Sequence, residues 1–222
     1  MISERWGKGR SKKETALLDE MFKARARLFR DRMKWDVSVD SLGREIDAYD
    51  VLNPLYTIAT DETGHHVGSM RMLPSSGPTM LAEHFQSLGD GIRFESDSVW
   101  EVTRFCVEAG DVAAMKRFGV QRMTQRLMLA CCEIGLREDW RCVVGVFDRR
   151  MKRIYARVGW SPMVLGQADS PEGPIYLGLW EVEEKHAAKM RELGNIKDAN
   201  LVSSDQNAAE PTSKRSLRSD VI

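Results

Sequence analysis

The 222-residue sequence contains no hydrophobic run long enough to cross a bilayer as a helix. Residues 1–8 carry no apolar stretch, so they do not resemble a signal peptide. Basic and acidic residues balance at 33 each, and bulk charge therefore predicts neither a nucleic-acid partner nor binding to a membrane surface. These absences lead us to expect a cytoplasmic protein.

Metal-site spacing is also missing. The four cysteines form no Cys-x-x-Cys pair, and the four histidines show no ligand spacing. We interpret the cysteines as reduced, buried thiols, and we expect no metal site. The P-loop, Gly-x-Ser-x-Gly and dinucleotide-binding fingerprints are absent too, so the sequence does not predict those common nucleotide and serine-hydrolase sites.

Hydrophobic residues make up 42% of the chain, which is enough for one sizeable core. We expect a single domain over residues 14–194, preceded by a flexible segment at 1–13 and followed by a disordered tail at 195–222. Helical periodicity appears at 14–33, 79–85, 111–136 (with a break expected near Gly119), 148–158 and 181–193. Strand patterns appear at 55–60, 67–73, 100–106, 141–147, 161–165 and 175–180. This order predicts an α/β protein, built as an α+β sandwich around one mixed sheet.

The strand expected at residues 100–106 carries two charges, Glu101 and Arg104, among core-forming residues. Such charges usually serve something other than stability, although an edge strand with two solvated charges is the ordinary alternative. Strict alternation places Trp100, Val102, Arg104 and Cys106 on one face, and Glu101, Thr103 and Phe105 on the other. If Glu101 and Arg104 share a pocket, the strand needs a β-bulge or a sharp twist between them.

Other charges also stand in unusual places. Arg25 falls on an apolar helical stripe, where it either snorkels to the surface or points into a polar pocket at the edge of the core. Asp47 and Asp50 lie in an acidic loop, where each either caps a turn or stays solvated. Residues 117–122 resemble the phosphate-cradling turn of acetyltransferases through Gly119, with a plain helix start as the alternative.

The helix expected at 148–158 is strongly basic. Its first ten residues hold a single acid, Asp148, and five cations, Arg149, Arg150, Lys152, Arg153 and Arg157. A solvated face is the usual meaning of such a run. In a chain without net charge, the same run also suits an acidic partner or a phosphate.

Taken in order, several blocks resemble the acyl-homoserine lactone synthases, the LuxI-type autoinducer synthases. The blocks are Arg25-x-x-x-Phe29 with Trp35, Glu45-Ile46-Asp47-Ala48-Tyr49-Asp50, the 68–74 segment around Arg71, Met80-Leu81 with Phe85, and Trp100-Glu101-Val102-Thr103-Arg104-Phe105. Ile46 stands where the family has phenylalanine. The matches span residues 15–165 and keep the spacing of the family.

The resemblance implies a fold like the GNAT-type N-acetyltransferases, with a twisted mixed sheet split to admit an acyl-pantetheine arm. It implies two substrates, S-adenosylmethionine and an acyl thioester, on acyl carrier protein (ACP) or alternatively on coenzyme A, and no cofactor. The α-amine of adenosylmethionine attacks the thioester. Its carboxylate then displaces methylthioadenosine and closes the lactone, which is a quorum-sensing signal.

The resemblance also implies roles for single residues. Glu101 is the first candidate for the base that deprotonates the amine, with Asp47 or Asp50 second. Arg25, Arg71 and Arg104 are expected to hold the substrate carboxylate and organise the acids. Backbone N–H groups beside Arg104 would polarise the thioester oxygen. The other expected adenosylmethionine contacts are Phe29, Trp35, Thr103 and Phe105, of which Phe29 and Trp35 would cover the sulfonium.

For the acyl group, the expected pocket residues are Met123, Leu127, Val143, Gly145 and Phe147, with plain core as the alternative for each. Gly145 aligns with a family threonine that goes with 3-oxo acyl groups, which favours a chain that is not 3-oxo. The basic helix would dock the carrier protein through Arg149, Arg150, Lys152, Arg153 and Arg157.

Two other functions fit part of this pattern. A generic GNAT-type N-acyltransferase using acyl-CoA has no need of the Arg25, Trp35, Asp47 and Asp50 set. A non-catalytic carrier-protein-binding module predicts that Glu101→Gln leaves function intact.

Overall fold

The computed structural model describes residues 2–5, 12–108, 113–197 and 202–203, and everything below concerns those residues. A single sheet runs through the molecule in the order β6-β7-β5-β4-β3-β2-β1-β8. Neighbouring strands are antiparallel except for two parallel pairs, β4–β5 and β1–β8. The strands are β1 (Ile2–Arg5), β2 (Leu55–Thr60), β3 (His66–Pro74), β4 (Val99–Val107), β5 (Cys142–Asp148), β6 (Met163–Ser170), β7 (Gly173–Glu181) and β8 (Val202–Ser203).

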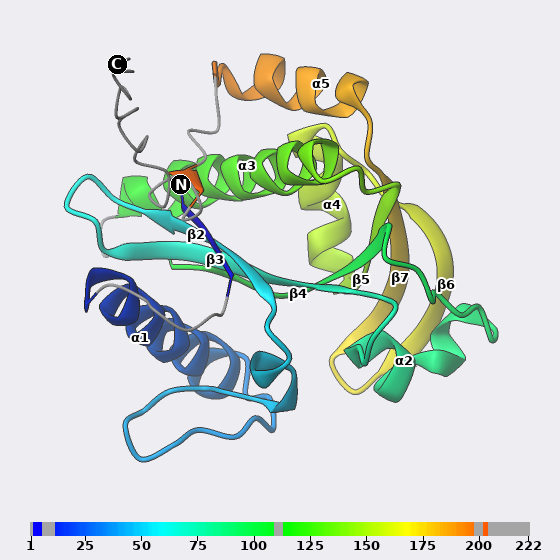
Figure 1. The fold of residues 1–222 in the computed structure, drawn as a ribbon, viewed down its shortest axis with the longest axis horizontal. Helices are drawn as coiled ribbons and strands as arrows, with labels where there is room; N and C mark the ends of the chain where they lie inside the picture. The colour runs from blue at the N-terminus through cyan, green and yellow to red at the C-terminus, as the bar shows by residue number, and fades with distance from the viewer. Residues whose placement is uncertain (1, 6–11, 109–112, 198–201, 204–222) are drawn as a thin grey trace, which may run out of the picture.

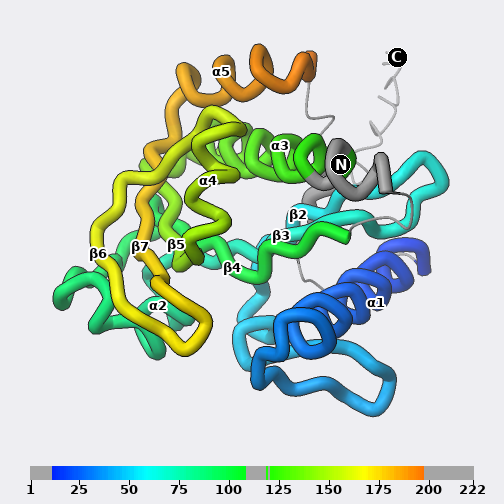
Figure 2. The backbone as a smooth tube through the Cα atoms, turned by 180° about the vertical axis from the view of Figure 1, so that it is seen from behind, coloured from blue at the N-terminus to red at the C-terminus, as the bar shows by residue number. Residues whose placement is uncertain are grey.

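Helices cover both faces of this sheet (Figures 1 and 2). One face carries α1 (Lys12–Ala26), its π-helical extension η1 (Arg27–Arg32) and α2 (Met80–His84). The other face carries α3 (Ala113–Arg137) and α4 (Arg149–Val158), with α5 (Glu184–Gly194) packed outside α3. Two short 3-10 turns are η2 (Ala48–Val51) and η3 (Gln86–Gly89). The predicted mixed sheet with flanking helices is confirmed.

The main core lies between the sheet and α3 with α4, and includes Leu127, Ile134, Val143, Phe147 and Trp180. A smaller apolar cluster lies under α1, where Leu18, Met21 and Phe22 meet Tyr56 and Ile58 of β2. No helix in the described ranges is long and apolar enough to cross a membrane.

Local signals set both ends of α4. Asp148 accepts a hydrogen bond from the N–H of Met151 at 2.7 Å and caps the first turn. Gly159 takes φ +90° and stops the helix, a conformation that glycine adopts without steric penalty.

Three predicted segments differ from the observed elements in type or extent. α3 runs through Gly119 without a break, so residues 117–122 lie within a helix that uses their N–H groups itself, and they form no phosphate-cradling turn. The helix predicted at 14–33 changes to π type at Arg27. The two short strands predicted after α4 form one long hairpin, β6–β7.

The ends of the chain add strands that the sequence did not predict. Ile2–Arg5 pairs with β2, inside the segment expected to be flexible. Ile196 is buried in the main core, two residues beyond the predicted domain boundary. The rest of the predicted flexible segment up to residue 11, and most of the predicted tail, lie outside the described residues.

Candidate active site

β4 and β5 separate partway along the sheet. The two strands pair only from Val99 to Glu101 against Cys142 to Val144, although both continue further. A β-carbon added at Gly145 would lie 3.0 Å from the carbonyl oxygen of Val102, so the strands are still close where they part. The split that the resemblance implies therefore lies next to Glu101.

β4 contains the predicted β-bulge, placed one residue later than expected. Thr103 pairs with Arg71 and Cys106 pairs with Ser69, so two residues of β4, Arg104 and Phe105, oppose one residue of β3. Arg104 takes φ +53°, a left-handed conformation that a non-glycine residue adopts at a cost of about 1–2 kcal/mol. The bulge thus holds strain at a residue that carries a charge.

The bulge also changes which side chains share a face. Arg104 joins Glu101 and Thr103 on the α1 side of the sheet, whereas Phe105 packs with Val102 against the core under α3. Strict alternation was therefore the wrong prediction for Arg104 and Phe105. Phe105 is separated by the sheet from the residues expected to hold adenosylmethionine, because the extra residue turns it over.

Three arginines and three carboxylates form a buried ion-pair network on the α1 side. Arg25 donates both terminal nitrogens to Asp50 at 2.9 Å and its Nε to Glu45. Arg71 Nη1 donates to Asp50 at 2.9 Å and also to Asp47. Arg104 donates to Glu45 at 3.0 and 3.1 Å, and its Nη2 lies 2.8 Å from Asp47.

This network, defined by Arg25, Glu45, Asp47, Asp50, Arg71 and Arg104, carries three positive and three negative charges. Its side chains are between 0% and 19% exposed. Buried charges persist only when they are paired, which the balance of charge achieves here. The network brings together Arg25, Arg71, Arg104, Asp47 and Asp50, as predicted.

The loop before β2 folds so that its aspartates both cap and pair. Asp47 accepts the N–H of Tyr49 at 2.9 Å, while Asp50 accepts the N–H of Asp47 at 2.8 Å, which is a capping box on η2. Burial alone would raise the pKa of Asp50, but the hydrogen bonds and charge of Arg25, together with Arg71 and Tyr56, hold that pKa well below its usual range. The lowered pKa makes Asp50 a weak proton acceptor, and its hydrogen bonds hold Arg25 and Arg71 in place; its predicted catalytic role stays a prediction.

Glu101 lies beside the network, at the first turn of α2. Its carboxylate accepts the N–H groups of Met80 and Leu81, at 3.0 and 2.5 Å, and it is 3% exposed. Burial raises the pKa of Glu101, and the two N–H groups and the charges of Arg71 and Arg104 only partly oppose this. A raised pKa brings a carboxylate closer to the range in which it accepts a proton at neutral pH.

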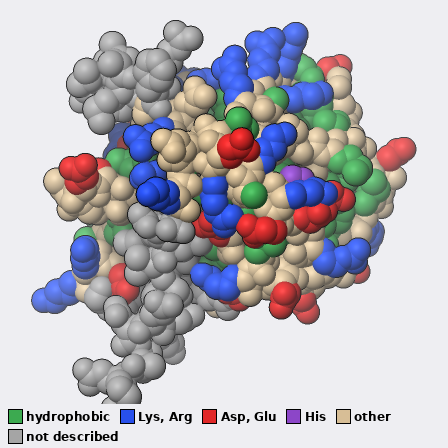
Figure 3. All heavy atoms as spheres, turned by 90° about the horizontal axis from the view of Figure 1, so that it is seen from above, with side chains coloured by type: hydrophobic (Ala, Val, Ile, Leu, Met, Phe, Trp, Pro, Cys, Tyr) green, Lys and Arg blue, Asp and Glu red, His purple; other side chains and the backbone are tan. Residues whose placement is uncertain are grey.

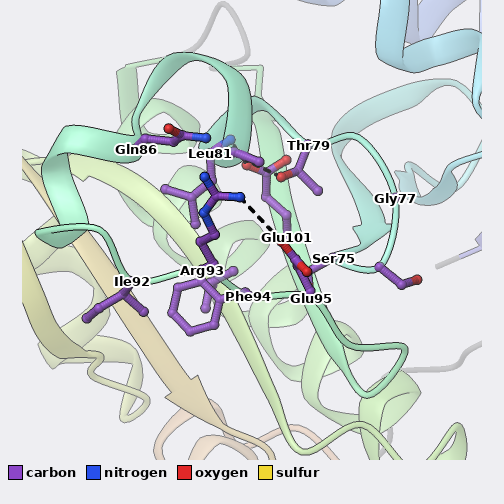
Figure 4. Close-up of a pocket in the computed structure, with 13 residues that line it drawn as sticks. Ser75, Gly77, Thr79, Leu81, Gln86, Ile92, Arg93, Phe94, Glu95 and Glu101 are labelled. Carbon is purple, nitrogen blue, oxygen red and sulfur yellow. Dashed lines mark hydrogen bonds and ion pairs between the residues drawn. The ribbon is translucent and has the colours of Figure 1, made fainter.

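A pocket of about 270 Å³ opens on the side of Glu101 that faces α2 (Figure 4). Thr79 and Leu81 line it near the carboxylate, and Arg93 and Glu95 line it from the loop before β4. The carboxylate of Glu101 thus borders a space open to solvent molecules, although the side chain itself is buried.

Two predicted aromatic contacts stand at the edge of the network. Phe29 and Trp35 stack with ring centroids 5.0 Å apart and planes 10° apart, and the guanidinium of Arg104 lies 5.4 Å from the Phe29 centroid. Phe29 is buried, whereas Trp35 is 39% exposed. The π-helical turn η1 carries Phe29 into this stack, and such turns often occur at functional sites. Thr103 accepts a hydrogen bond from Arg71 Nε at 3.0 Å, so it orients Arg71.

Sequence reasoning missed three residues of the site. Glu45 bridges Arg25 and Arg104, Met80 contacts two arginines, and Tyr56 donates to Asp50. The charge count of the predicted set could have indicated Glu45. Three arginines facing two aspartates leave one positive charge that needs a further carboxylate. Met80 falls in a block that resembles the family, but no role was predicted for it, and no pattern indicated Tyr56.

The predicted acyl-pocket residues lie on the α3 side of the sheet, on both sides of the split. Met123 and Leu127 of α3 pack over Gly68, where an added β-carbon would lie 3.2 and 3.1 Å from them. Phe147 packs among the rings of Tyr155, Tyr176 and Trp180, and Val143 pairs with Trp180 across β5 and β7. A β-carbon added at Gly145 would lie 3.8 Å from the ring of Trp180.

All five predicted docking cations of α4 are exposed. Within the described part of the chain, none of the five forms an ion pair, although Lys152 lies 4.6 Å from the centroid of the Tyr176 ring. In the view from above, Lys and Arg side chains gather along the upper edge of the molecule (Figure 3). The positive charge of α4 is thus free for an external partner.

Comparison with known proteins identifies the family. A family model described as autoinducer synthase matches residues 10–190. The chain belongs to the autoinducer synthase family. It is 36% identical over 177 residues to an acyl-homoserine-lactone synthase of Rhizobium etli, across 78% of this chain and 81% of the relative. The crystal structure of the AHL synthase LasI is similar with a TM-score of 0.74 and 28% identity, over 86% of this chain and 93% of that one.

More distant structures share the fold of this autoinducer synthase. BjaI, described as a CoA-dependent acyl-homoserine lactone synthase with SAM and isopentyl-CoA, has a TM-score of 0.75 at 20% identity, over 86% and 87% of the two chains. A putative N-acetyltransferase from Lactobacillus plantarum has a TM-score of 0.51 at 15% identity, over 78% and 94%. The GNAT-like fold and the enzyme class, an acyltransferase of the acyl-homoserine-lactone synthase type, are both confirmed.

Proposed function

We propose that this acyl-homoserine-lactone synthase joins S-adenosylmethionine to an acyl group delivered by ACP, in the cytoplasm and without a cofactor. The observation that carries the proposal is the buried network of three arginines and three carboxylates beside Glu101, at the split between β4 and β5. A generic N-acyltransferase needs no such network. A substrate that presents a carboxylate, an amine and a sulfonium together gives it a purpose.

The first chemical step is N-acylation. Glu101 takes a proton from the α-ammonium of adenosylmethionine, directly or through a water, because burial raises its pKa and its carboxylate borders the pocket. The free amine attacks the thioester carbonyl, a C–N bond forms, and the C–S bond to pantetheine breaks with the thiol as leaving group. N–H groups at the bulge beside Arg104 stabilise the oxyanion.

The second step closes the ring. A carboxylate oxygen of the acylated adenosylmethionine attacks its γ-carbon, the bond from that carbon to the sulfonium sulfur breaks, and methylthioadenosine leaves as a neutral thioether. The aromatic pair Phe29 and Trp35 lies beside Arg104, where it can cover the sulfonium until this bond breaks. Asp50 stays ionised throughout and holds Arg25 and Arg71 in place.

The unpaired cations of α4 favour ACP over coenzyme A as the donor. ACP is acidic, and five exposed positive charges on one short helix complement it. Gly145 leaves no side chain at the split, which favours an acyl chain without a 3-oxo group. Coenzyme A is the runner-up carrier, because a protein of the same fold is described as CoA-dependent.

A donor panel tests this proposal. The full chain is incubated with adenosylmethionine and with matched acyl-ACP and acyl-CoA donors of several lengths, both unsubstituted and 3-oxo, and products are followed by mass spectrometry. We expect an acyl-homoserine lactone and methylthioadenosine in equal amounts, fastest with unsubstituted acyl-ACP. Acylation of other amines by acetyl-CoA, with no methylthioadenosine, would instead support the generic acyltransferase.

Charge reversal on α4 tests the docking helix. We expect Arg150→Glu with Arg153→Glu to raise KM for acyl-ACP at least about tenfold, since the charges meet only the carrier protein, and to leave KM for adenosylmethionine unchanged. Arg137→Glu with Lys185→Glu, two exposed sites on α3 and α5, is the matched control. An equal rise in KM for acyl-ACP in both pairs would refute a docking role for α4.

A further inference from the structure

Two nitrogens of the network are left over after the carboxylates are paired. All three side-chain nitrogens of Arg25 donate to Glu45 or Asp50. Arg71 and Arg104 each use two nitrogens on Thr103 or a network carboxylate. Within the described residues, the third nitrogen of each, Arg71 Nη2 and Arg104 Nη1, meets no oxygen.

Both leftover nitrogens point at the same atom, the sulfur of Met80. Arg71 Nη2 lies 3.5 Å from Met80 Sδ, and Arg104 Nη1 lies 3.4 Å from it. A neutral thioether is a weak acceptor, so two buried guanidinium groups here share a poor partner. Two N–H donors from different arginines converging on one point is an arrangement that a carboxylate oxygen satisfies far better, through charge-assisted bonds of about 2.7–2.9 Å.

Met80 is placed so that it can leave this position. Met80 is half-buried, whereas Arg71, which it contacts, is fully buried, so Met80 lies between the network and the surface. Met80 is the first residue of the five-residue helix α2, and its three rotatable side-chain bonds allow many conformations. Its backbone N–H, in contrast, is fixed by Glu101.

We infer that the sulfur of Met80 occupies the position of the substrate carboxylate, and that adenosylmethionine displaces it on binding. The inference rests on the proposed function for its ligand. A carboxylate at this point lies next to the residue whose N–H holds Glu101. The α-amine, one carbon away from the carboxylate, is then held close to the proposed base. Met80 thus acts as a gate: its sulfur accepts the N–H groups of Arg71 and Arg104 until the substrate carboxylate replaces it.

Methyl NMR tests the displacement directly. The full chain is labelled with [methyl-¹³C]methionine, and the Met80 signal is assigned by its loss in Met80→Leu. We expect adenosylmethionine and S-adenosylhomocysteine to shift the Met80 signal. Decarboxylated adenosylmethionine, which keeps the amine and the sulfonium, should bind without doing so. Met163, an exposed methionine of β6, is the reference signal that none of the three should move.

Affinity gives a second, independent measure. Only a carboxylated ligand has to displace the sulfur, so we expect the ratio of Kd for decarboxylated to intact adenosylmethionine to rise about three- to tenfold in Met80→Ala. The ratio cancels any general loss of packing, and Met163→Ala should leave it unchanged. An unchanged ratio in Met80→Ala, or an equal shift of the Met80 signal by the decarboxylated ligand, would overturn the inference.

The donor panel separates the two possible failures. If lactone forms while Met80 does not respond, the gate is wrong and the proposed function stands. If neither lactone nor binding of adenosylmethionine is found, both are wrong.

Discussion

The two faces of the sheet are buried differently, because only the α1 side combines apolar packing with an ion-pair network. Under α3 and α4, aliphatic and aromatic side chains such as Leu127, Val143 and Trp180 form one continuous core. Under α1, the interior beside β3 and β4 holds the ion-pair network. Each buried apolar side chain stabilises the fold by about 1.5–3 kcal/mol, whereas a buried ion pair often gives little or no net stability against a well-packed apolar alternative.

The difference teaches where the function lies. The core under α3 and the smaller apolar cluster under α1 explain why the chain folds, whereas the ion-pair network is an arrangement that folding alone does not favour. β4 belongs to both, because Val102 and Phe105 enter the apolar core while Glu101, Thr103 and Arg104 enter the polar site. A strained residue at the bulge makes this double use possible.

The largest effect should come from breaking the network. We expect Asp50→Asn to lower the free energy of unfolding by about 3–5 kcal/mol and to abolish lactone formation, because Arg25 and Arg71 lose their shared counter-charge. Urea denaturation followed by circular dichroism measures this. Asp40→Asn, a substitution of an exposed aspartate paired with Arg44, should leave the free energy of unfolding nearly unchanged.

The pH dependence separates the two faces. The pKa of Asp50 is depressed in the folded state. Its contribution to the free energy of unfolding is therefore complete above the pKa of an aspartate in the unfolded chain, about 3.9, and is lost as pH falls through the pKa of the folded state. Asp50→Asn should remove the fall in the free energy of unfolding at acid pH that protonation of Asp50 causes. Leu127→Ala is the control on the apolar face. It should lower the free energy of unfolding by about 2–5 kcal/mol and leave the acid-side slope of that free energy against pH unchanged. Equal slopes in both variants would contradict the ionic role of Asp50.

Removing the proposed base should affect rate more than stability. We expect Glu101→Gln to lower turnover at least about 100-fold across the pH range, because a side-chain amide does not accept the proton of the α-ammonium. Stability at neutral pH should stay within about 1 kcal/mol, because the loss of one backbone hydrogen bond is offset by removal of a buried charge. Glu95→Gln, at the rim of the same pocket, is the control. Near-normal turnover in Glu101→Gln would show that another group is the base.

Glu101→Gln should also change how the free energy of unfolding depends on pH. The folded pKa of Glu101 is raised above the unfolded value of about 4.3, so the folded wild type takes up this proton first as pH falls. The free energy of unfolding of the wild type therefore rises as pH decreases from the folded-state pKa of Glu101 to its unfolded-state pKa. This effect is opposite in sign to that of Asp50. Glu101→Gln should lack this gain, which titration of stability between neutral pH and pH 4 measures.

Sequence reasoning reached much of the α1 face because charges in apolar patterns are conspicuous. Arg25 on an apolar stripe, and Glu101 with Arg104 in one strand, indicated a polar pocket as one alternative, and the family resemblance then favoured a shared pocket with a bulge. Alternation could not give the position of the bulge, since that depends on the register between β3 and β4. The error propagated to Phe105, which one extra residue moved to the other face.

The α3 face was harder to predict for the opposite reason. Its residues are all apolar, and composition does not distinguish a wall of an acyl pocket from ordinary core. Met80 was missed because its role depends on two nitrogens left over by pairings that only the three-dimensional arrangement reveals. The strand β1 was missed because four residues near a chain end carry little periodic signal.

The smallest effect should come from the point where the two faces meet. A β-carbon at Gly145 would lie 3.0 Å from the Val102 oxygen, a contact that forces β4 and β5 apart by a few tenths of an ångström. We expect Gly145→Ala to change stability by about 1 kcal/mol and to lower kcat/KM for acyl donors about three- to tenfold, with KM for adenosylmethionine unchanged, since the network lies on the other side of β4. Gly77→Ala, where a β-carbon meets nothing within 4 Å, is the control and should leave kcat/KM unchanged. A rise in KM for adenosylmethionine in Gly145→Ala would mean that the split and the network move together, and the two faces would then be one mechanical unit.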